Sequence, residues 1–249
     1  SGGIAIMVGL LIFHFFSQFP LVILISLFLI TIIGSLDDKY SLSKIQRFSL
    51  QLLLSVLLIY ESTDVHDKSL IYMFFSLIVL VYFINMVNFI DGIDGLSAGL
   101  SLTSLFSIIL FSYYSDTIQN FYDIEIFIII ILTTILFIIF NFSKNYKIFL
   151  GDSGSMTIGF LIAWFLILYT QNYKLFHPVL AIWCVSLPTF DLITVVVRRL
   201  LRKKNPFKPD RRHIHHILLS IGMSNKYVTI YFGALEASCE LAKEKGAYE

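Results

Sequence analysis

Charged residues are scarce in this sequence: Asp, Glu, Lys and Arg make up 14% of its 249 residues, whereas 57% are hydrophobic. The segment Ser69–Val87 carries no charge at all. A water-soluble domain would alternate apolar and polar faces, but here the apolar stretches are long and closely spaced, and a bilayer span needs about 20 such residues. Because hydrocarbon leaves no water for backbone polar groups, these runs must be helices. The sequence predicts an all-α, polytopic transmembrane helical bundle.

Cysteine is also rare, and the two present, Cys184 and Cys239, lie far apart. We expect free thiols and no disulfide framework. The chain does not open with a basic segment followed by a small-residue cleavage site, so no secretory signal peptide is predicted. The net charge of +1 gives no reason to expect a nucleic acid partner.

Apolar segments of sufficient length recur along the chain and predict about eight membrane spans, of which the first and third are short. These segments are Ile4–Phe16, Phe19–Leu36, Phe48–Tyr60, Ser69–Ile90, Leu96–Tyr114, Ile124–Phe142, Ser155–Thr170 and Pro178–Leu200.

The basic residues are distributed very unevenly between the two sides that eight spans would define. One side receives Lys68 and Lys174. The other receives Lys39, Lys44, Arg47, Lys144, Lys147, Arg198, Arg199, Arg202, Lys203, Lys204, Lys208, Arg211 and Arg212. Since loops rich in Lys and Arg stay in the cytoplasm, the second side is predicted to be cytoplasmic.

Four polar clusters then fall on this cytoplasmic side, each at the end of an apolar run. They are "LDDKY" with Asp37 and Asp38, "NFIDGIDG" from Asn88 to Gly95, "FLGDSGS" with Asp152, and "DRRHIHH" from Asp210 to His216. Because all four share one face, we predict that residues far apart in sequence form one site there.

The acids suggest a cation and a phosphate substrate. Alone, Asp37 and Asp38 fit a solvated loop, and Asp152 fits a helix N-cap equally well. Asp91 and Asp94 stand one helical turn apart, each before a glycine. Converging carboxylates repel one another unless a cation lies between them, and an all-oxygen ligand set favours Mg²⁺ together with phosphate oxygens. Nearby Lys and Arg would neutralise phosphate, which indicates phosphoryl transfer at the membrane surface.

The histidines of "HIHH", His213, His215 and His216, allow two interpretations. A three-histidine zinc site is one. The adjacent arginines Arg211 and Arg212 favour the other, in which the cluster binds an anionic phosphate.

The stretches "GSLDDKYSLSKIQ", "NMVNFIDGIDGLSAG", "IFLGDSGSMTIGF" and "NPFKPDRRHIHHIL" resemble, in order, the motifs of the polyprenyl-phosphate N-acetylhexosamine-1-phosphate transferases. Members of that family move a sugar 1-phosphate from a UDP-sugar to undecaprenyl phosphate and release UMP. "HIHH" resembles the branch that uses UDP-GlcNAc. The resemblance implies an enzyme of the bacterial cytoplasmic membrane whose partners are a UDP-N-acetylhexosamine, undecaprenyl phosphate and the bilayer, and it leaves a homodimer open.

The same resemblance implies roles for individual residues. Asp152 would be the principal Mg²⁺ ligand, with Asp91 as a second ligand and Mn²⁺ as a substitute ion. Asp37 and Asp38 would hold or deprotonate the lipid phosphate. The nucleotide pocket would be formed by Asn88, Asp91 and Asp94, with Asp94 near the uracil and Phe149 stacked on the base. The diphosphate and sugar would contact Arg211, Arg212, His213, His215 and His216. Lys39, one of the basic residues beside the acids, is predicted to bind substrate by neutralising phosphate.

Two departures from the family pattern concern the chain ends. The family has ten or eleven spans, so we expect the first span and the last spans to lie outside residues 1–233, the transferase core. Residues 234–249 are predicted to form a polar helical tail. This tail resembles a piece of the large subunit of class I ribonucleotide reductase, which would make it a segment of foreign origin joined to the transferase core.

Three rival functions remain. An ion-coupled transporter would keep ionisable residues within its spans, and here Asp191 is the one so placed, where a buried helix contact is the simpler interpretation. An intramembrane aspartyl protease would need Asp123 beside Asp152, but the predicted topology puts them on opposite faces. A truncated, inactive transferase is the third.

Overall fold

A computed structural model describes residues 2–16, 21–62, 70–114, 121–172, 182–203 and 214–246. Within these ranges the chain is helical and has no β-strand. The elements are α1 (Gly2–Phe16), α2 (Leu21–Tyr40), α3 (Lys44–Ser62), α4 (Leu70–Ile90), α5 (Leu96–Tyr114), α6 (Phe121–Asn141), α7 (Gly151–Ile167), the π-helical turn η1 (Leu168–Asn172), α9 (Ser186–Leu201), α10 (Ile214–Ser220) and α11 (Asn225–Gly246).

The helices follow the predicted apolar segments closely, and α5 has the predicted bounds. Among the described helices, those long and apolar enough to cross a membrane are Leu21–Tyr40, Leu70–Ile90 and the continuous stretch Gly151–Gln171. The all-α membrane fold is therefore confirmed, whereas the number of eight spans stays a prediction.

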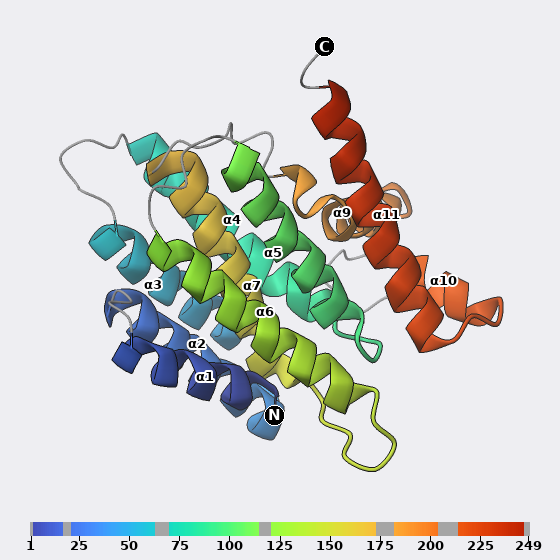
Figure 1. Cartoon of the computed structure of the whole chain (residues 1–249), viewed down its shortest axis with the longest axis horizontal. Helices are drawn as coiled ribbons and strands as arrows, with labels where there is room; N and C mark the ends of the chain where they lie inside the picture. The colour runs from blue at the N-terminus through green and yellow to red at the C-terminus, as the bar shows by residue number, and fades with distance from the viewer. Residues whose placement is uncertain are drawn as a thin grey trace.

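Helix α7 occupies the middle of the bundle, with α2 and α4 packed along it (Figure 1). Every residue from Ser153 to Ile167 is buried. The outer helices instead expose large apolar side chains, such as Phe28, Leu53 and Phe74, at 49%, 58% and 59% of their area. A surface this apolar suits contact with lipid tails, and α7 is the core helix.

Glycine brings the backbones of α2 and α7 into direct contact. A Cβ atom on Gly34 would lie 2.3 Å from the Cα atom of Ser153, so no larger residue fits there. One turn earlier the hydroxyls of Thr31 and Thr157 share a hydrogen bond of 2.8 Å. Small residues and hydroxyl contacts are the usual means by which membrane helices approach closely. This contact sets the position of the next turn of α2, which carries Asp38.

The connection from α2 to α3 is short and defined by its side chains. Ser41 adopts a positive φ of 51°. Ser43 and Gln46 then form a reciprocal capping box: the Ser43 N–H donates to Gln46 Oε1 at 3.1 Å, and the Gln46 N–H donates to Ser43 Oγ at 3.3 Å. The box starts α3 at Lys44 and places Arg47 in its first turn, facing the end of α2.

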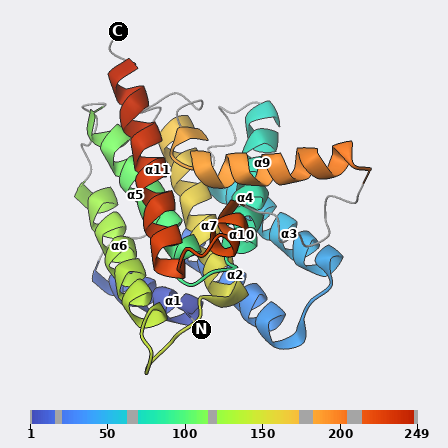
Figure 2. The same cartoon turned by 90° about the vertical axis from the view of Figure 1, so that its right-hand side faces the viewer.

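The predicted eighth span, Pro178–Leu200, overlaps α9, and its residues 178–181 lie outside the described part of the chain. Pro188 stands in the first turn of α9, where its missing N–H costs no helical hydrogen bond. Figure 2 shows α9 running crosswise in front of α4 and α7, with α10 beside the start of α11.

Helix α11 packs along α5 and is continuous across the predicted boundary at residue 233. Within it, Glu236 is buried and accepts a hydrogen bond of 2.6 Å from the Thr103 hydroxyl. The division into a core and a tail stays a prediction.

Candidate active site

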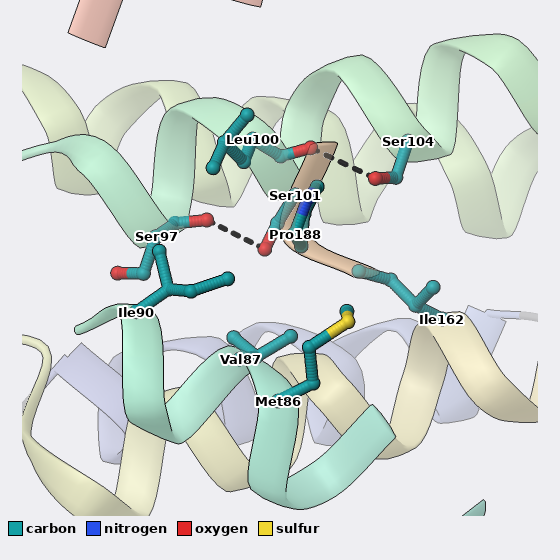
Figure 3. A pocket seen from close by; sticks show the side chains of 9 residues that line it. All are labelled: Met86, Val87, Ile90, Ser97, Leu100, Ser101, Ser104, Ile162 and Pro188. Carbon is teal, nitrogen blue, oxygen red and sulfur yellow. Dashed lines mark hydrogen bonds between the residues drawn. The ribbon is translucent and has the colours of Figure 1, made fainter. Parts of the chain in front are cut away.

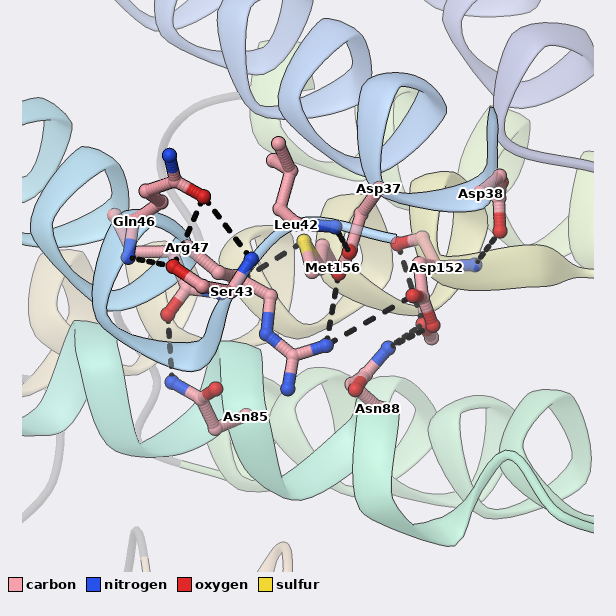
Figure 4. Close-up of polar contacts among 12 residues, drawn as sticks. Asp37, Asp38, Leu42, Ser43, Gln46, Arg47, Asn85, Asn88, Asp152 and Met156 are labelled. Atoms are coloured by element: carbon pink, nitrogen blue, oxygen red, sulfur yellow. Dashed lines mark hydrogen bonds and ion pairs between the residues drawn. The ribbon is translucent and has the colours of Figure 1, made fainter. Parts of the chain in front are cut away.

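Asp38, in the last turn of α2, caps the N-terminus of α7 from outside that helix (Figure 4). Its Oδ1 accepts the Asp152 N–H at 2.8 Å, and its Oδ2 accepts the Ser153 N–H at 3.3 Å and the Ser153 hydroxyl at 3.1 Å. The first N–H groups of a helix have no partner within it and favour a negative charge. The interpretation of Asp152 as the N-cap is wrong, because Leu150 holds that position without a side-chain cap.

Asp37 is buried, with 5% of its side chain exposed, and both of its oxygens have donors. Oδ1 accepts the Leu42 N–H at 2.8 Å, and Oδ2 accepts from Arg47 Nη1 at 2.9 Å. The solvated-loop interpretation of this aspartate is therefore wrong: α2 continues through it, and its carboxylate fixes the turn into α3.

Arg47 links two of the acidic clusters. The same Nη1 atom that pairs with Asp37 lies 3.8 Å from Oδ2 of Asp152, whose side chain is 36% exposed. Arg47 thus supplies positive charge between carboxylates from α2 and α7, and it forms a charge-assisted hydrogen bond with the buried Asp37.

The acidic helix start of α7 also contacts α4. Asn88 Nδ2 donates to Asp152 Oδ1 at 2.7 Å and to the Ser155 hydroxyl at 2.9 Å. One turn below, Asn85 Nδ2 donates to Gln51 Oε1 at 2.7 Å, which ties α4 to α3 (Figure 4). Asn88 thus fixes the Asp152 side chain while leaving part of it exposed.

The turn between α4 and α5 holds Asp91, whose Oδ1 accepts the Ser97 hydroxyl at 2.6 Å. The pKa of Asp91 is raised from 3.8 to about 6, mainly by burial and in smaller part by the charges of Asp152, Asp38 and Asp94, while the hydrogen bond from Ser97 acts to lower it. Because electrostatic repulsion falls with distance, this mutual effect indicates that the four acids share one neighbourhood.

Asp94 turns toward the loop before α7 and toward α11. Lys147 Nζ lies 2.7 Å from its Oδ2 and 5.0 Å from the ring centre of Phe149, which is 64% exposed. Asn225 Nδ2 donates to the same Oδ2 at 3.3 Å. Lys147 therefore contacts both Asp94 and Phe149, the two residues that the resemblance assigns to the nucleobase.

His215 and His216 lie on α10. His215 is 1% exposed, and its ring centre is 4.4 Å from that of His216. A Cβ on Gly92 would lie 3.8 Å from His215 Nε2, so this ring faces the turn that contains Asp91. The predicted residues Arg211, Arg212 and His213 fall outside the described part of the chain.

Not every predicted residue joins the cluster. Lys39 is exposed, and its Nζ lies 5.1 Å from the ring centre of its neighbour Tyr40. Conversely, the structure adds Ser97 and Asn225 as hydrogen-bond partners of the acids, and it places Lys147 against Asp94. A lone serine or asparagine gives no sequence signal for such a contact. The capping box in "SKIQR" is a signal that α3 begins at Lys44, with Arg47 in its first turn.

A small pocket lies between α4, α5, α7 and α9, beneath the Asp91 turn (Figure 3). Three serines line it, but each of their hydroxyls already has an acceptor. Ser97 donates to Asp91 Oδ1, Ser101 to the Ser97 carbonyl and Ser104 to the Leu100 carbonyl. The remaining lining is largely apolar: Met86, Val87, Ile90, Leu100, Ile162 and Pro188. Such a pocket offers a diphosphate nothing to bind, so the polar chemistry belongs to the carboxylate cluster above it.

The cluster suits a hard cation. No group of three or more Asp, Glu, His or Cys side chains with metal-binding geometry occurs in the described ranges. Mg²⁺ needs no such cage, because it is commonly held by one or two carboxylates together with substrate phosphates. The two carboxylates to which the sequence analysis assigns the ion are Asp152, whose side chain is partly exposed, and Asp91, in the same negative neighbourhood.

Comparison with known proteins points the same way. Residues 20–170 match the sequence profile of glycosyl transferase family 4. Proteins named undecaprenyl-phosphate alpha-N-acetylglucosaminyl 1-phosphate transferase, from Haemophilus influenzae and Pasteurella multocida, are each 32% identical to it over 256 residues, or 96% of this chain and 72% of the relative. A protein of that name from Yersinia pestis is 40% identical to this chain over 100 residues, which cover 39% of this chain and 27% of the length of the relative.

The family profile covers the first three polar clusters, and the Haemophilus and Pasteurella relatives match almost the whole chain. These matches confirm the prediction of a transferase enzyme. The chain belongs to glycosyl transferase family 4.

Proposed function

We propose that this chain transfers N-acetylglucosamine 1-phosphate from its UDP-sugar to undecaprenyl phosphate, giving the undecaprenyl-diphosphate sugar and UMP. This is the first membrane step of cell-surface polysaccharide synthesis. The names of the Haemophilus and Pasteurella relatives support the acceptor and the sugar. The observation that carries the proposal is Asp152: an accessible carboxylate at the start of the buried helix α7, held by Asn88 from α4 and approached by Arg47 from α3.

In the proposed reaction an oxygen of the lipid phosphate attacks the phosphorus that bears the sugar. The bond from that phosphorus to the bridging oxygen breaks, and UMP leaves with the electron pair. A lipid phosphate is already an anion, so it needs positioning more than activation. Both oxygens of Asp37 and both of Asp38 already accept hydrogen bonds, which favours direct attack over a covalent carboxylate intermediate.

We assign Mg²⁺, with Mn²⁺ as a substitute, to Asp152 and Asp91. When bound, the ion would neutralise charge on the diphosphate. Arg47 would add positive charge from the protein itself. The nucleotide would lie between Asp94 and Phe149, with Asn88 at the inner side, and the diphosphate and sugar would contact the histidines and Arg211 and Arg212. Lys39, at the rim, would contact the lipid phosphate.

We further infer eight spans in the bacterial cytoplasmic membrane, with the site on the cytoplasmic side. The excess of Lys and Arg in the loops next to the acidic clusters supports this orientation. The site then lies where a soluble nucleotide meets a membrane-bound lipid.

The test is UMP release by the purified protein in lipid nanodiscs, with undecaprenyl phosphate and a panel of UDP-N-acetylhexosamines, with and without Mg²⁺. We expect release with UDP-GlcNAc, its loss on chelation, and a fall of at least about 100-fold in Asp152→Asn. The exposed-loop variant Lys144→Met is the control and should retain activity. Absence of UMP release from the unaltered chain in every condition would refute the proposal, and proton flux in liposomes without UMP release would favour the transporter.

A further inference from the structure

Asp191 is a buried carboxylate that the reaction described above does not use. It lies in α9 and is 3% exposed. A carboxylate in an apolar helix is costly unless its oxygens have donors. Oδ1 of Asp191 accepts the backbone N–H of Ile214 at 3.1 Å, across a sequence separation of 23 residues. Ile214 is the first residue of α10.

Helix α10 depends on contacts of this kind. It has seven residues, and helices shorter than about 12 residues are marginal in water without tertiary support. Its first N–H groups have no partner within the helix and favour a negative charge. Asp191 therefore does for α10 what Asp38 does for α7: a carboxylate from one helix fixes the start of another.

The contact determines where the histidines lie. His215 follows Ile214 directly, and its buried ring faces Gly92 in the turn that holds Asp91. A shift of the α10 start would move this ring away from that turn. Asp191 is thus joined to the wall of the site through its hydrogen bond with the Ile214 backbone, although it lies on a different helix from the acids of the cluster.

We propose that Asp191 is a positioning residue of the transferase site, which holds the α10 N-terminus so that His215 and His216 face the acidic turn. The kinetic part of this statement depends on the proposed function, and the structural part does not. The essential property is the acceptor oxygen facing the Ile214 N–H, so an amide can replace the carboxylate.

Three variants test whether Asp191 positions the start of α10. Asp191→Ala removes the acceptor, and Asp191→Asn keeps an acceptor oxygen. Ile214→Pro removes the donor while leaving the buried carboxylate in place, and proline is well tolerated in a first helical turn. Ile214 is 40% exposed, so little packing is lost. Thr194→Ala, on the exposed face of α9, is the matched control.

Hydrogen exchange of peptides covering 214–220 should be faster in Asp191→Ala and Ile214→Pro than in the unaltered chain, and unchanged in Asp191→Asn and Thr194→Ala. Peptides from α2 and α7 should keep their protection in all four. In the transfer assay, Asp191→Ala and Ile214→Pro should raise KM for the UDP-sugar about 10-fold and leave KM for undecaprenyl phosphate within about twofold, with Asp191→Asn near the unaltered chain.

Unchanged exchange at 214–220 in both disrupting variants would overturn the proposal. So would loss of turnover in Asp191→Asn with full protection of α10, because that result assigns the role to the charge. If Asp191→Ala does not fold, Ile214→Pro carries the same test. A chain with no transferase activity that still shows the exchange pattern would refute the proposed function and leave the anchoring of α10 intact.

Discussion

The carboxylate of Asp38 accepts the backbone N–H of Asp152, with 2.8 Å between oxygen and nitrogen. One acid of the site therefore positions another, from a different helix. This relationship gives Asp38 a role as an anchor of α7, in addition to any contact with substrate.

Replacement of Asp38 tests that role. Asp38→Ala leaves the first N–H groups of α7 without their acceptor and should lower stability by about 1–2 kcal/mol, as loss of a helix cap does. Because Asp38 positions Asp152, Asp38→Ala should also weaken Mn²⁺ binding. Asp38→Asn keeps one acceptor oxygen and should recover much of both properties. Thermal unfolding measures the stability, and titration with Mn²⁺ measures the affinity. Equal and complete loss of turnover in both variants, with normal metal affinity, would point to proton transfer by Asp38 instead.

The contact between Gly34 and Ser153 should tolerate no side chain. A Cβ at Gly34 would lie 2.3 Å from backbone, so Gly34→Ala must separate α2 from α7, and we expect a loss of about 1–3 kcal/mol together with reduced activity. Gly233→Ala is the matched control, since a Cβ there would meet Thr103 Cγ2 at 3.5 Å, an ordinary contact. Similar melting temperatures for the two variants would contradict the close packing.

Arg47 should contribute more to the free energy of unfolding than an exposed basic residue such as Arg202. Arg47→Gln leaves the buried Asp37 carboxylate without its cation, and breaking such a pair costs about 3–5 kcal/mol. Arg47→Lys should recover part of this. Arg202→Gln, on an exposed position at the end of α9, should unfold like the unaltered chain. The measurement is the free energy of unfolding in detergent, and a neutral Arg47→Gln would exclude the assigned pairing.

The raised pKa of Asp91 predicts a pH-dependent effect on stability. The folded protein keeps the proton up to about pH 6, whereas an exposed aspartate releases it near 3.8. Stability therefore falls as the pH rises through this window, and the full cost applies above about pH 6. Without Mg²⁺, Asp91→Asn should stabilise the protein at pH 7.5 by up to about 3 kcal/mol, and by about a third of that at pH 4.5.

Melting curves of Asp91→Asn and the unaltered chain in chelator, at both pH values, provide the check. Asn can still accept the Ser97 hydroxyl, so that contact is preserved. A stabilisation of the same size at both pH values would show that the proton on Asp91 is not its cause.

The sequence was sufficient to predict the helices, because long charge-free runs such as Ser69–Val87 have no other structure in lipid. It also led to the family, through motifs whose order is specific. It did not predict that Asp37 and Asp38 belong to α2, since a pair of acids after an apolar run is equally typical of a loop. Nor did it predict the partners of these acids: Arg47 and Asn88 reach Asp152 through tertiary packing, which depends on Gly34 and on helix geometry.

Helix α7 is enclosed by its neighbours, with Ser153 to Ile167 all buried. We therefore expect lipid tails to contact α2, α3 and α4 and not the helix that carries Asp152. A change in acyl-chain length is met by tilting or local bilayer thinning around the outer helices, at a fraction of a kcal/mol per ångström. We expect the depth of the acids relative to one another to be preserved across membranes of different thickness, so that the enzyme accommodates changes in lipid composition without rebuilding its catalytic geometry.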